Sequence, residues 1–410
     1  MKPRNKLKIL NDPIYGFITV PNKRIFDLIE HPYFQRLRRI SQMGLSYLVY
    51  PGAHHTRFHH ALGCMHLMQK AVRTLRFKGI EISETEEEAL LIAILLHDIG
   101  HGPFSHAMEN SIVNGISHEW ISLQFMEKMN TDFNQSLTLA IEIFQGKHQR
   151  KFFSQLIASQ LDMDRLDYLK RDSFYTGVAE GNINAERLIT MLNVADDRLV
   201  VEEKGIYSVE KFLIARRLMY WQVYLHKTSL AAEQLLIRVL KRAKFLIGKG
   251  EKLPASNALS HFLKNQVNKT RFTSETLEIF SQLDDYDIVS AMKEWRHCND
   301  FVLKNLCEMI LDRSLLKIKI KKSPVPKEKL ESHRKKLQEK HGISEVEAAY
   351  FVFGGEISNL AYETSDENIN ILFKNGKIKD VAKASDQLNL TALSKTVTKY
   401  YICYPKPKLN

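Results

Sequence analysis

The sequence predicts a mainly α-helical body over residues 1–314, followed by a smaller α/β module over residues 315–410. Two observations carry this prediction. Before Leu315, apolar residues recur at helical spacing through most of the chain. From Leu315 the pattern changes to L-K-I-K-I-K, an alternation of period two that is typical of a strand with one solvent face. The length of 410 residues allows two or three domains, or one large core with an appendage.

The composition is that of an ordinary globular protein, with 44% hydrophobic and 26% charged residues. No apolar run is long enough for a membrane span, and no apolar segment follows the lysine-rich start as it would in a signal peptide. The cysteines, without paired spacing, favour a reducing cytoplasm and argue against a thiolate zinc site. They are Cys64, Cys298, Cys307 and Cys403. We expect a cytoplasmic protein that does not contact membranes.

The formal net charge is +12, and much of the excess lies in residues 317–340. A basic surface suits an anionic partner, either a phosphorylated metabolite or a nucleic acid. A solvated basic face without a partner explains the same run equally well. Nucleic acid is therefore a secondary candidate partner.

In chain order, N-D-P-I-Y-G at 11–16 predicts a turn, and residues 24–42 have helical spacing interrupted at His31-Pro32. Residues 57–77 predict a helix with a broad apolar face. Further helices are expected over 117–129, 136–144, 151–170, 210–245 and within 256–310, with a hairpin over 199–208 that turns at Lys204-Gly205.

The module from 315 onward mixes strands with one charged helix. Asn375-Gly376 is the strongest short hairpin signal in the chain. We expect a helix over 327–341 and strands over 349–353, 369–373 and 396–404.

A helix over 84–96 is the most apolar segment. Ser83 or Thr85 can cap it, and glutamates crowd its first turn, where the helix dipole favours anions. Its second half is apolar on every face and so must be buried on all sides. This helix runs directly into His97 and Asp98.

An ionisable pair at the end of a buried helix is costly unless it is compensated. A divalent metal would compensate it, because imidazole and carboxylate together ligate Zn, Mn, Fe or Ni. Adjacent helical residues lie about 100° apart, so one ion can touch His97 and Asp98 only from beside the helix end, and further ligands must come from elsewhere. A buried His–Asp hydrogen bond without metal is the alternative.

Two other segments can supply those ligands. In R-F-H-H, His60 is a better candidate than His59, because Leu67 lies on the same helical face. From D-M-D-R-L-D-Y-L-K-R-D we favour Asp164, which completes a His/His-Asp/Asp set with positions left for water and substrate. The carboxylates of that segment are Asp162, Asp164, Asp167 and Asp172.

Further polar residues follow the His-Asp pair. His106 and Glu109 are three residues apart on the expected next helix and can share a proton. Several residues could bind phosphates, although each alone is more often a surface charge or a satisfied core residue. They are Arg57, Arg165, Tyr168, Arg216, Tyr224, His226 and Lys227.

Five motifs stand in a characteristic order: N-D-P-I-Y-G (11–16), F-Q-R-L-R-R-I (34–40), Y-P-G-A-H-H-T-R-F-H-H-A-L-G (50–63), H-D-I-G-H-G-P-F-S-H (97–106) and D-M-D-R-L-D-Y-L-K-R-D (162–172). In this order they closely resemble the HD-domain deoxynucleoside triphosphate triphosphohydrolases. That family holds the bacterial dGTPases and the vertebrate dNTPase with a SAM domain. The resemblance is strong over residues 8–245 and looser beyond, and no SAM domain precedes the expected HD body.

The resemblance implies one divalent metal ion per subunit (Mn, Zn, Fe, Ni or Mg) and water attack on the α-phosphorus of a dNTP, giving a deoxynucleoside and tripolyphosphate. It implies His60, His97, Asp98 and Asp164 as metal ligands. His106 would be the acid, positioned by Glu109 and supported by His118. Arg57, His101, Arg165, Tyr168 and Arg216 match triphosphate-binding positions. Gln42 and Asp172 match positions that read the 3′-hydroxyl, and Tyr224 matches the aromatic residue under the sugar.

Some positions depart from the vertebrate pattern. His59 stands in place of Glu, Arg165 in place of Lys, and Tyr220 in place of His. An allosteric guanine-nucleotide site at a tetramer interface is matched by Lys8, Asn11, Gln35 and Arg38, while Glu30 replaces its guanine-reading Asp. A homotetramer is favoured over a dimer, and nucleotide activation is a hypothesis.

Other functions remain open, as does a preference for dGTP. The chain could be an HD phosphohydrolase of another nucleotide phosphate ester, although it lacks the Gly-Tyr-Pro of cyclic-di-GMP enzymes. It could also be a catalytically silent nucleotide sensor or nucleic-acid-binding protein. Against silence, every ligand and acid–base position holds a competent residue.

Overall fold

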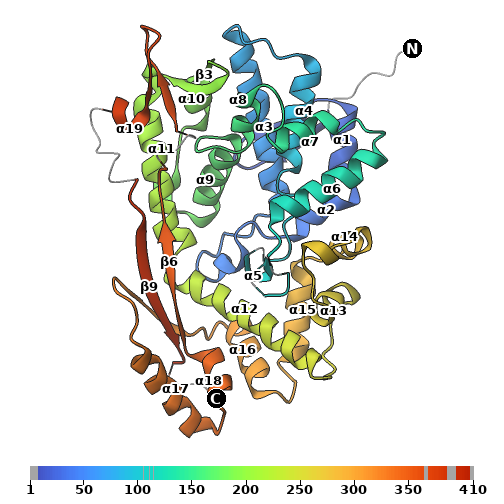
Figure 1. Cartoon of the computed structure of the whole chain (residues 1–410), viewed down its shortest axis with the longest axis vertical. Coiled ribbons are helices and arrows are strands. Elements are labelled where there is room, and N and C mark those ends of the chain that lie inside the picture. Colours follow the sequence, from blue (N-terminus) through green and yellow to red (C-terminus); the bar gives the residue numbers. More distant parts are fainter. Residues whose placement is uncertain are drawn as a thin grey trace.

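The computed structural model describes residues 8–104, 106–109, 111–113, 115–363, 368–385 and 394–406, with only the backbone at His106. Helices dominate, and the strands form three small sheets (Figure 1). The predicted fold class, a mainly helical body with a smaller C-terminal α/β part, is confirmed. Within the described ranges, no helix is long and apolar enough to cross a membrane.

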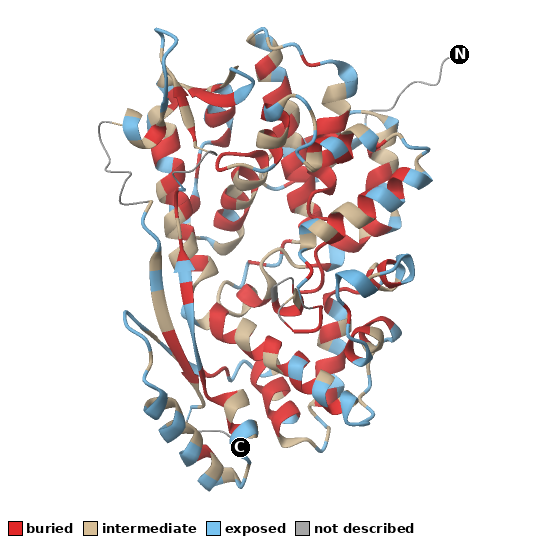
Figure 2. Cartoon of the chain, in the orientation of Figure 1, coloured by how far each residue is buried: buried red, intermediate tan, exposed pale blue. Residues whose placement is uncertain are grey.

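The centre of the body is formed by three helices, α3 (Arg57–Phe77), α4 (Glu84–Leu96) and α9 (Met163–Thr176), with α3 packed against both others. Ser83 is the cap of α4, because its side chain accepts from the Glu86 N–H while Glu86 reaches back to the Ser83 N–H. All residues from 89 to 96 are buried, as predicted. Figure 2 shows buried residues along these helices.

The N-terminal turn is an antiparallel hairpin of β1 (Lys8–Asp12) and β2 (Gly16–Val20). The Asp12 carboxylate closes it by accepting hydrogen bonds from the N–H groups of Ile14 and Tyr15, each at 2.9 Å. The expected break at Pro32 separates α1 (Lys23–Glu30) from α2 (Pro32–Gln35).

Two long helical predictions are each split in the structure. The segment 151–170 contains α8 (Lys151–Ile157) and then α9, whose N-terminus is capped by Asp162. The segment 210–245 contains α11 (Ile206–Met219), a π-helical turn at Tyr220–Tyr224 and α12 (Lys227–Gly248). The other helices of the body are α5 (His106–Glu109), α6 (His118–Asp132), α7 (Thr138–Phe144), α10 (Ala185–Thr190), α13 (Asn257–Lys264), α14 (Ser274–Phe280), α15 (Asp285–Trp295) and α16 (Phe301–Leu311).

The hairpin predicted to turn at Lys204-Gly205 is wrong. The strands are β3 (Leu192–Ala195) and β4 (Arg198–Glu202), and they turn at Asp196-Asp197. Both aspartates have positive φ, 50° and 55°, a conformation that Asp tolerates better than most side chains. Residues 203–205 form a 3-10 turn that leads into α11.

The C-terminal part contains the antiparallel sheet β5–β9–β6, with strands β5 (Lys317–Lys321), β6 (Phe353–Asn359) and β9 (Val397–Tyr404). The helix α17 (Lys327–His341) has the predicted bounds. The strand expected at 349–353 is wrong, because a capping box at Ser344 starts α18 (Glu345–Phe351) there.

The hairpin at Asn375-Gly376 is confirmed. It joins β7 (Asn370–Leu372) to β8 (Ile378–Asp380), and α19 (Val381–Ala384) follows. Gly376 has a φ of +79°, which explains the glycine. Strand β7 also pairs in parallel with β4 of the body. The domain boundary at 314/315 therefore remains a prediction, because the two parts share one sheet.

A half-buried imidazole gives the fold a dependence on pH. His66 of α3 packs against the ring of Tyr15 in the N-terminal hairpin, with ring centroids 5.0 Å apart. Burial, assisted by the charge of Lys70, lowers the pKa of His66 from 6.5 to about 4. Between these values the unfolded chain binds a proton that the folded chain excludes, so folding stability falls as the pH falls.

We predict that His66→Gln weakens the pH dependence of unfolding. Denaturation midpoints at pH 7.5 and 5.5 should drop with pH more steeply in the wild type than in the variant, because Gln does not titrate. The exposed His297, as His297→Gln, is the matched control and should retain the wild-type slope. Identical slopes for all three proteins would contradict the prediction.

Candidate active site

The residues predicted as metal ligands lie together at the ends of the three central helices. His60 Nε2 lies 3.0 Å from Asp164 Oδ1, and His97 Nε2 lies 3.6 Å from the same atom. Asp98 stands 3.4 Å from His97 Nε2 and 3.8 Å from His60 Nε2. Two imidazoles and two carboxylates from three segments of the chain therefore lie close together.

Both imidazoles present Nε2 toward this point because Nδ1 has another partner. His97 Nδ1 lies 2.7 Å from the Ile94 carbonyl oxygen, and His60 Nδ1 lies 2.8 Å from Asp167 Oδ2. His97 Nε2 is buried and has no hydrogen-bond partner within the described part of the chain. A buried nitrogen left over beside two carboxylates fits a divalent cation, and partners on Nδ1 are typical of metal-binding histidines.

The turn after α4 is fixed from α6. The Ser122 hydroxyl donates to the His97 carbonyl at 2.7 Å and accepts from the Gly100 N–H at 2.9 Å. Burial raises the pKa of the Asp98 carboxyl, but the surrounding positive charges, above all that of His97, outweigh this effect and bring the pKa well below its usual value. Asp98 is thus an anion, which is the form in which a carboxylate binds a metal.

The four carboxylates of the 162–172 motif have four different positions. Asp162 caps α9 by accepting from the Arg165 N–H at 2.7 Å. Asp164 belongs to the cluster, Asp167 lies behind His60, and Asp172 lines a neighbouring pocket. The sequence indicated the motif but not this division.

Asp167 was not predicted as a site residue, yet it orients a ligand. It accepts from Arg171 at 2.9 and 3.0 Å, and Arg171 also donates to Asp12 at 2.7 Å. Burial raises the pKa of Asp167, but the Arg171 guanidinium outweighs it and the pKa falls to about 2. Gly63 faces this pair so closely that a Cβ would lie 1.9 Å from Asp167 Oδ1. Glycine is therefore required at 63.

Cys64 lies one helical turn after His60, and its Sγ is 3.6 Å from His60 Nε2. His60, Cys64, His97 and Asp164 together form a group of potential ligand atoms within 4.8 Å of one another. Cysteine spacing argued against a thiolate at a metal site, but one thiol does stand beside this cluster. Burial raises the pKa of this thiol, which favours its protonated form.

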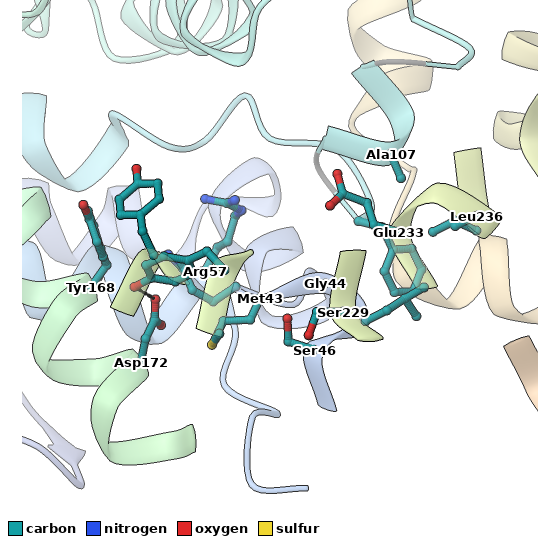
Figure 3. A pocket seen from close by; sticks show the side chains of 15 residues that line it. Met43, Gly44, Ser46, Arg57, Ala107, Tyr168, Asp172, Ser229, Glu233 and Leu236 are labelled. Atoms are coloured by element: carbon teal, nitrogen blue, oxygen red, sulfur yellow. Dashed lines mark hydrogen bonds between the residues drawn. The ribbon is translucent and has the colours of Figure 1, made fainter. Parts of the chain in front are cut away.

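A cavity of about 280 Å³ adjoins the cluster, with Arg57 common to both. Figure 3 shows Arg57, Tyr168 and Asp172 at one side of the pocket and Ser229, Glu233 and Leu236 of α12 at the other. Its further lining residues are Gln42, Met43, Gly44, Leu45, Ser46, Phe104, Ala107, Tyr220 and Tyr224.

Cationic and hydroxyl groups predicted to hold phosphates gather at the cluster side. Arg57 contacts Asp98, and Arg165 lies 3.2 Å from Asp162. Arg216 is buried, with Nε and Nη1 lacking partners among the described residues, and the buried Tyr168 hydroxyl likewise has none. Unsatisfied buried donors are costly, so these groups are suited to an anionic ligand.

The histidines beyond Asp98 form a second group. His101 Nε2 lies 3.3 Å from Asp98 Oδ1, and its ring stacks on His118 with centroids 3.8 Å apart. Burial, with the charge of Arg57, keeps the pKa of His101 well below its ordinary value, so His101 is neutral. Glu109 lies 3.2 Å from His118 Nδ1. The predicted pairing of Glu109 with the His106 side chain lies outside the described atoms.

The predicted sugar-contacting residues also lie together. The Tyr224 hydroxyl donates to Asp172 Oδ2 at 2.7 Å. Tyr220 and Tyr224 both come from the π-helical turn, with ring centroids 5.2 Å apart. Asp172 has another partner that the sequence did not reveal, the buried His55, whose Nε2 lies 2.6 Å from Oδ1.

The predicted allosteric residues lie on the N-terminal hairpin and the helices that follow it. Lys8, Asn11, Glu30 and Arg38 are exposed. Arg38 donates to Gln35 at 2.8 Å and lies over the Phe58 ring. Among these five residues, the structure thus shows Gln35 and Arg38 in contact with each other. His59, at the position that departs from the vertebrate Glu, caps α3 together with Thr56, its Nδ1 contacting the Thr56 N–H and hydroxyl.

Comparisons with known proteins agree with this geometry. A family model described as the HD domain matches residues 57–172, and one for an HD-associated region matches residues 183–250. A crystal structure of a phosphohydrolase from Bacteroides thetaiotaomicron superposes with a TM-score of 0.95 at 52% identity, covering 98% of this chain and 100% of that one. A deoxynucleoside triphosphate triphosphohydrolase SAMHD1 homolog from Dictyostelium discoideum is 34% identical over 56% of this chain and 48% of its own length.

The chain belongs to the HD-domain dNTP triphosphohydrolase-like family. It is an HD-type phosphohydrolase, and HD domains bind a divalent metal, which its His/Asp cluster can hold. The uncharacterized protein YwfO of Bacillus subtilis is 33% identical, with 98% of this chain and 94% of YwfO covered. The chain spans about half the length of its SAMHD1-named relatives.

The ion pair behind His60 should control both metal affinity and stability. We predict that Asp167→Asn lowers metal affinity about tenfold to a hundredfold, because His60 loses its anionic partner. It should also destabilise the fold by about 3 kcal/mol, because Arg171 is left buried without its full counter-charge. Metal content after equilibration with buffered Mn²⁺, together with denaturant unfolding, measures the two effects.

Asp27→Asn is the control, since Asp27 pairs with Lys23 on an exposed helix face at 2.6 Å. That change should cost at most about 0.5 kcal/mol and leave metal content unchanged. If Asp167→Asn bound metal as tightly as the wild type, the role assigned to Asp167 would be wrong.

Proposed function

We propose that this HD phosphohydrolase hydrolyses deoxynucleoside triphosphates to a deoxynucleoside and tripolyphosphate. One observation carries the proposal: Arg57 contacts Asp98 of the His/Asp cluster and lines the pocket that also holds the Asp172–Tyr224 pair, and the buried Arg216 lies near Tyr168 with donors that have no partner among the described residues. The cluster, the cations and the Asp172–Tyr224 pair would bind the metal, the triphosphate and the sugar of one dNTP, respectively.

His60, His97, Asp98 and Asp164 would hold the metal. Bound there, a divalent ion supplies Lewis acidity toward phosphoryl oxygens and lowers the pKa of water. Asp167 and the Ile94 carbonyl contact Nδ1 of His60 and His97, so that both imidazoles present Nε2 toward the metal position.

The phosphates would be bound by Arg57, Arg165, Arg216, Tyr168 and His101. Three guanidinium groups can form paired hydrogen bonds to phosphate oxygens, and they stabilise the charge that develops as the phosphorus is attacked. Arg165, held beside Asp162, keeps its charge but offers a planar fork where a lysine would offer a point charge.

The acid that protonates the leaving 5′-oxygen would be His106, with Glu109 and His118 as its support. Glu109 and His118 already lie within hydrogen-bonding distance. A general acid needs such a carboxylate to orient its imidazole and stabilise its charged form.

The sugar would lie between Tyr224 and the Asp172–Gln42 side. An aromatic ring against the sugar leaves little room for a 2′-hydroxyl, so deoxyribose is selected by shape. The base would reach the side lined by Met43, Leu45 and Phe104, and the dGTP preference stays a prediction.

The product assay tests this proposal. The purified protein should, with Mn²⁺, convert each dNTP, supplied singly or mixed, to deoxynucleoside and tripolyphosphate. Asp98→Ala should reduce the rate at least about a thousandfold, because a metal ligand and the Arg57 partner are lost together. Triphosphates that survive every condition would instead favour another phosphate ester as substrate, or a silent nucleotide sensor.

Nucleotide activation of a homotetramer is a second expectation, supported by the N-terminal residues named above. We predict a sigmoidal velocity curve that becomes hyperbolic when GTP or dGTP is added, because an activator that stabilises the active assembly removes the lag at low substrate. A curve that is hyperbolic throughout and indifferent to added guanine nucleotide would exclude activation. Glu30→Ala, on the exposed surface, should weaken the response without changing the saturated rate.

A further inference from the structure

His55 is a buried residue with no role in the reaction described so far. It is the second histidine of Y-P-G-A-H-H, in the loop before α3, and only 1% of its surface is exposed. Its ring stacks on Tyr175 of α9, with centroids 4.4 Å apart and planes 16° apart. Burial and stacking restrict the positions that the ring can take.

His55 contacts both residues that are proposed to read the sugar. Its Nε2 lies 2.6 Å from Asp172 Oδ1, and its backbone carbonyl accepts from the Gln42 N–H at 3.0 Å. The Gln42 side chain lines the pocket, and its buried Oε1 has no partner within the described atoms. His55 therefore contacts two residues that line the pocket from different segments of the chain.

The second carboxylate oxygen of Asp172 is also held, by the Tyr224 hydroxyl at 2.7 Å. A carboxylate has about four acceptor positions, and these two bonds leave others for a ligand. Because a carboxylate only accepts, its ligand partner must be a donor. A sugar hydroxyl is such a donor. A sugar that lacks this hydroxyl cannot donate a hydrogen bond to the Asp172 carboxylate.

We propose that His55 is the positioning residue of the sugar site: it fixes Asp172 and Gln42 so that the pocket selects substrates with a free 3′-hydroxyl. This inference rests on the proposed function. His55 acts through Asp172 and does not touch the substrate. Its effect should therefore appear only with substrates that carry the hydroxyl.

The test compares kcat/KM for each dNTP that the wild type cleaves with kcat/KM for its 2′,3′-dideoxy analogue. In His55→Leu, the value for the dNTP should fall about tenfold or more, because a hydrogen bond to a charged group is lost, while the value for the analogue changes little. His55→Gln, whose side-chain N–H can replace Nε2–H, should keep the wild-type ratio.

His54→Leu is the matched control. His54 is the neighbouring histidine, exposed and stacked on Tyr47 with ring centroids 5.0 Å apart. Its replacement should leave kcat/KM unchanged for both the dNTP and the analogue. Should His55→Leu fail to fold, His55→Asn replaces it, since its shorter amide cannot reach Asp172 and the ratio should fall there but not in His55→Gln.

Different results overturn different statements. An equal loss of kcat/KM with the dNTP and its dideoxy analogue would show that His55 only supports the fold. Values of kcat/KM for the dNTP that stay at the wild-type level in the Leu and Asn variants would show that His55 has no role. A wild-type chain that cleaves no dNTP would overturn the proposed function itself, and this inference with it.

Discussion

The site depends on one buried ion pair, Asp167 with Arg171, which lies behind His60 rather than in the pocket. It fixes the imidazole from α9, while Arg171 reaches on to Asp12 in the N-terminal hairpin. Helix α3, helix α9 and the N-terminal hairpin, which are far apart in sequence, are thereby held together. A buried charge that lost its partner would be costly, so each segment restricts the positions of the other two.

Pairing also explains how the protein accommodates other buried polar groups. His97, Asp98 and Arg57 are almost completely buried. Asp98 and Arg57 pair with each other across two segments, and His97 Nδ1 lies beside the Ile94 carbonyl of the helix that it follows. Among the described residues, several buried atoms without a hydrogen-bond partner lie at the cluster or the pocket, on His97, His101, Tyr168, Arg216 and Gln42, while others, such as those of Arg36 and His341, lie elsewhere.

Periodicity was enough to predict the elements whose burial is decided locally. Helix 84–96 is apolar on all faces and Asn375-Gly376 can form only a tight turn, and both predictions are confirmed. The hairpin at 196–197 was missed because two aspartates at positive φ give no strong local signal. The π-helical turn was missed for a related reason, since its apolar spacing continues that of the flanking helices.

Motif order and the resemblance supplied the candidate residues, many of which the structure brings together, while their roles remain proposals. Spacing alone could not divide four carboxylates among a cap, a cluster, a buried ion pair and a pocket. Nor could it reveal His55, because its partner Asp172 is distant in sequence and a histidine beside another histidine suggests no direction. These contacts are tertiary and depend on how α3 and α9 cross.

The π-helical turn has one more neighbour, the last strand of the chain. The ammonium group of Lys399 in β9 lies 3.6 Å from the ring centre of Trp221, between the two pocket tyrosines in sequence. Figure 1 shows the long ribbon of β6 and β9 running beside α11. This side of the pocket is thus supported from outside by strand β9. A shortened protein, or one with a bulky C-terminal fusion, would not be a neutral substitute for the whole enzyme in kinetic work.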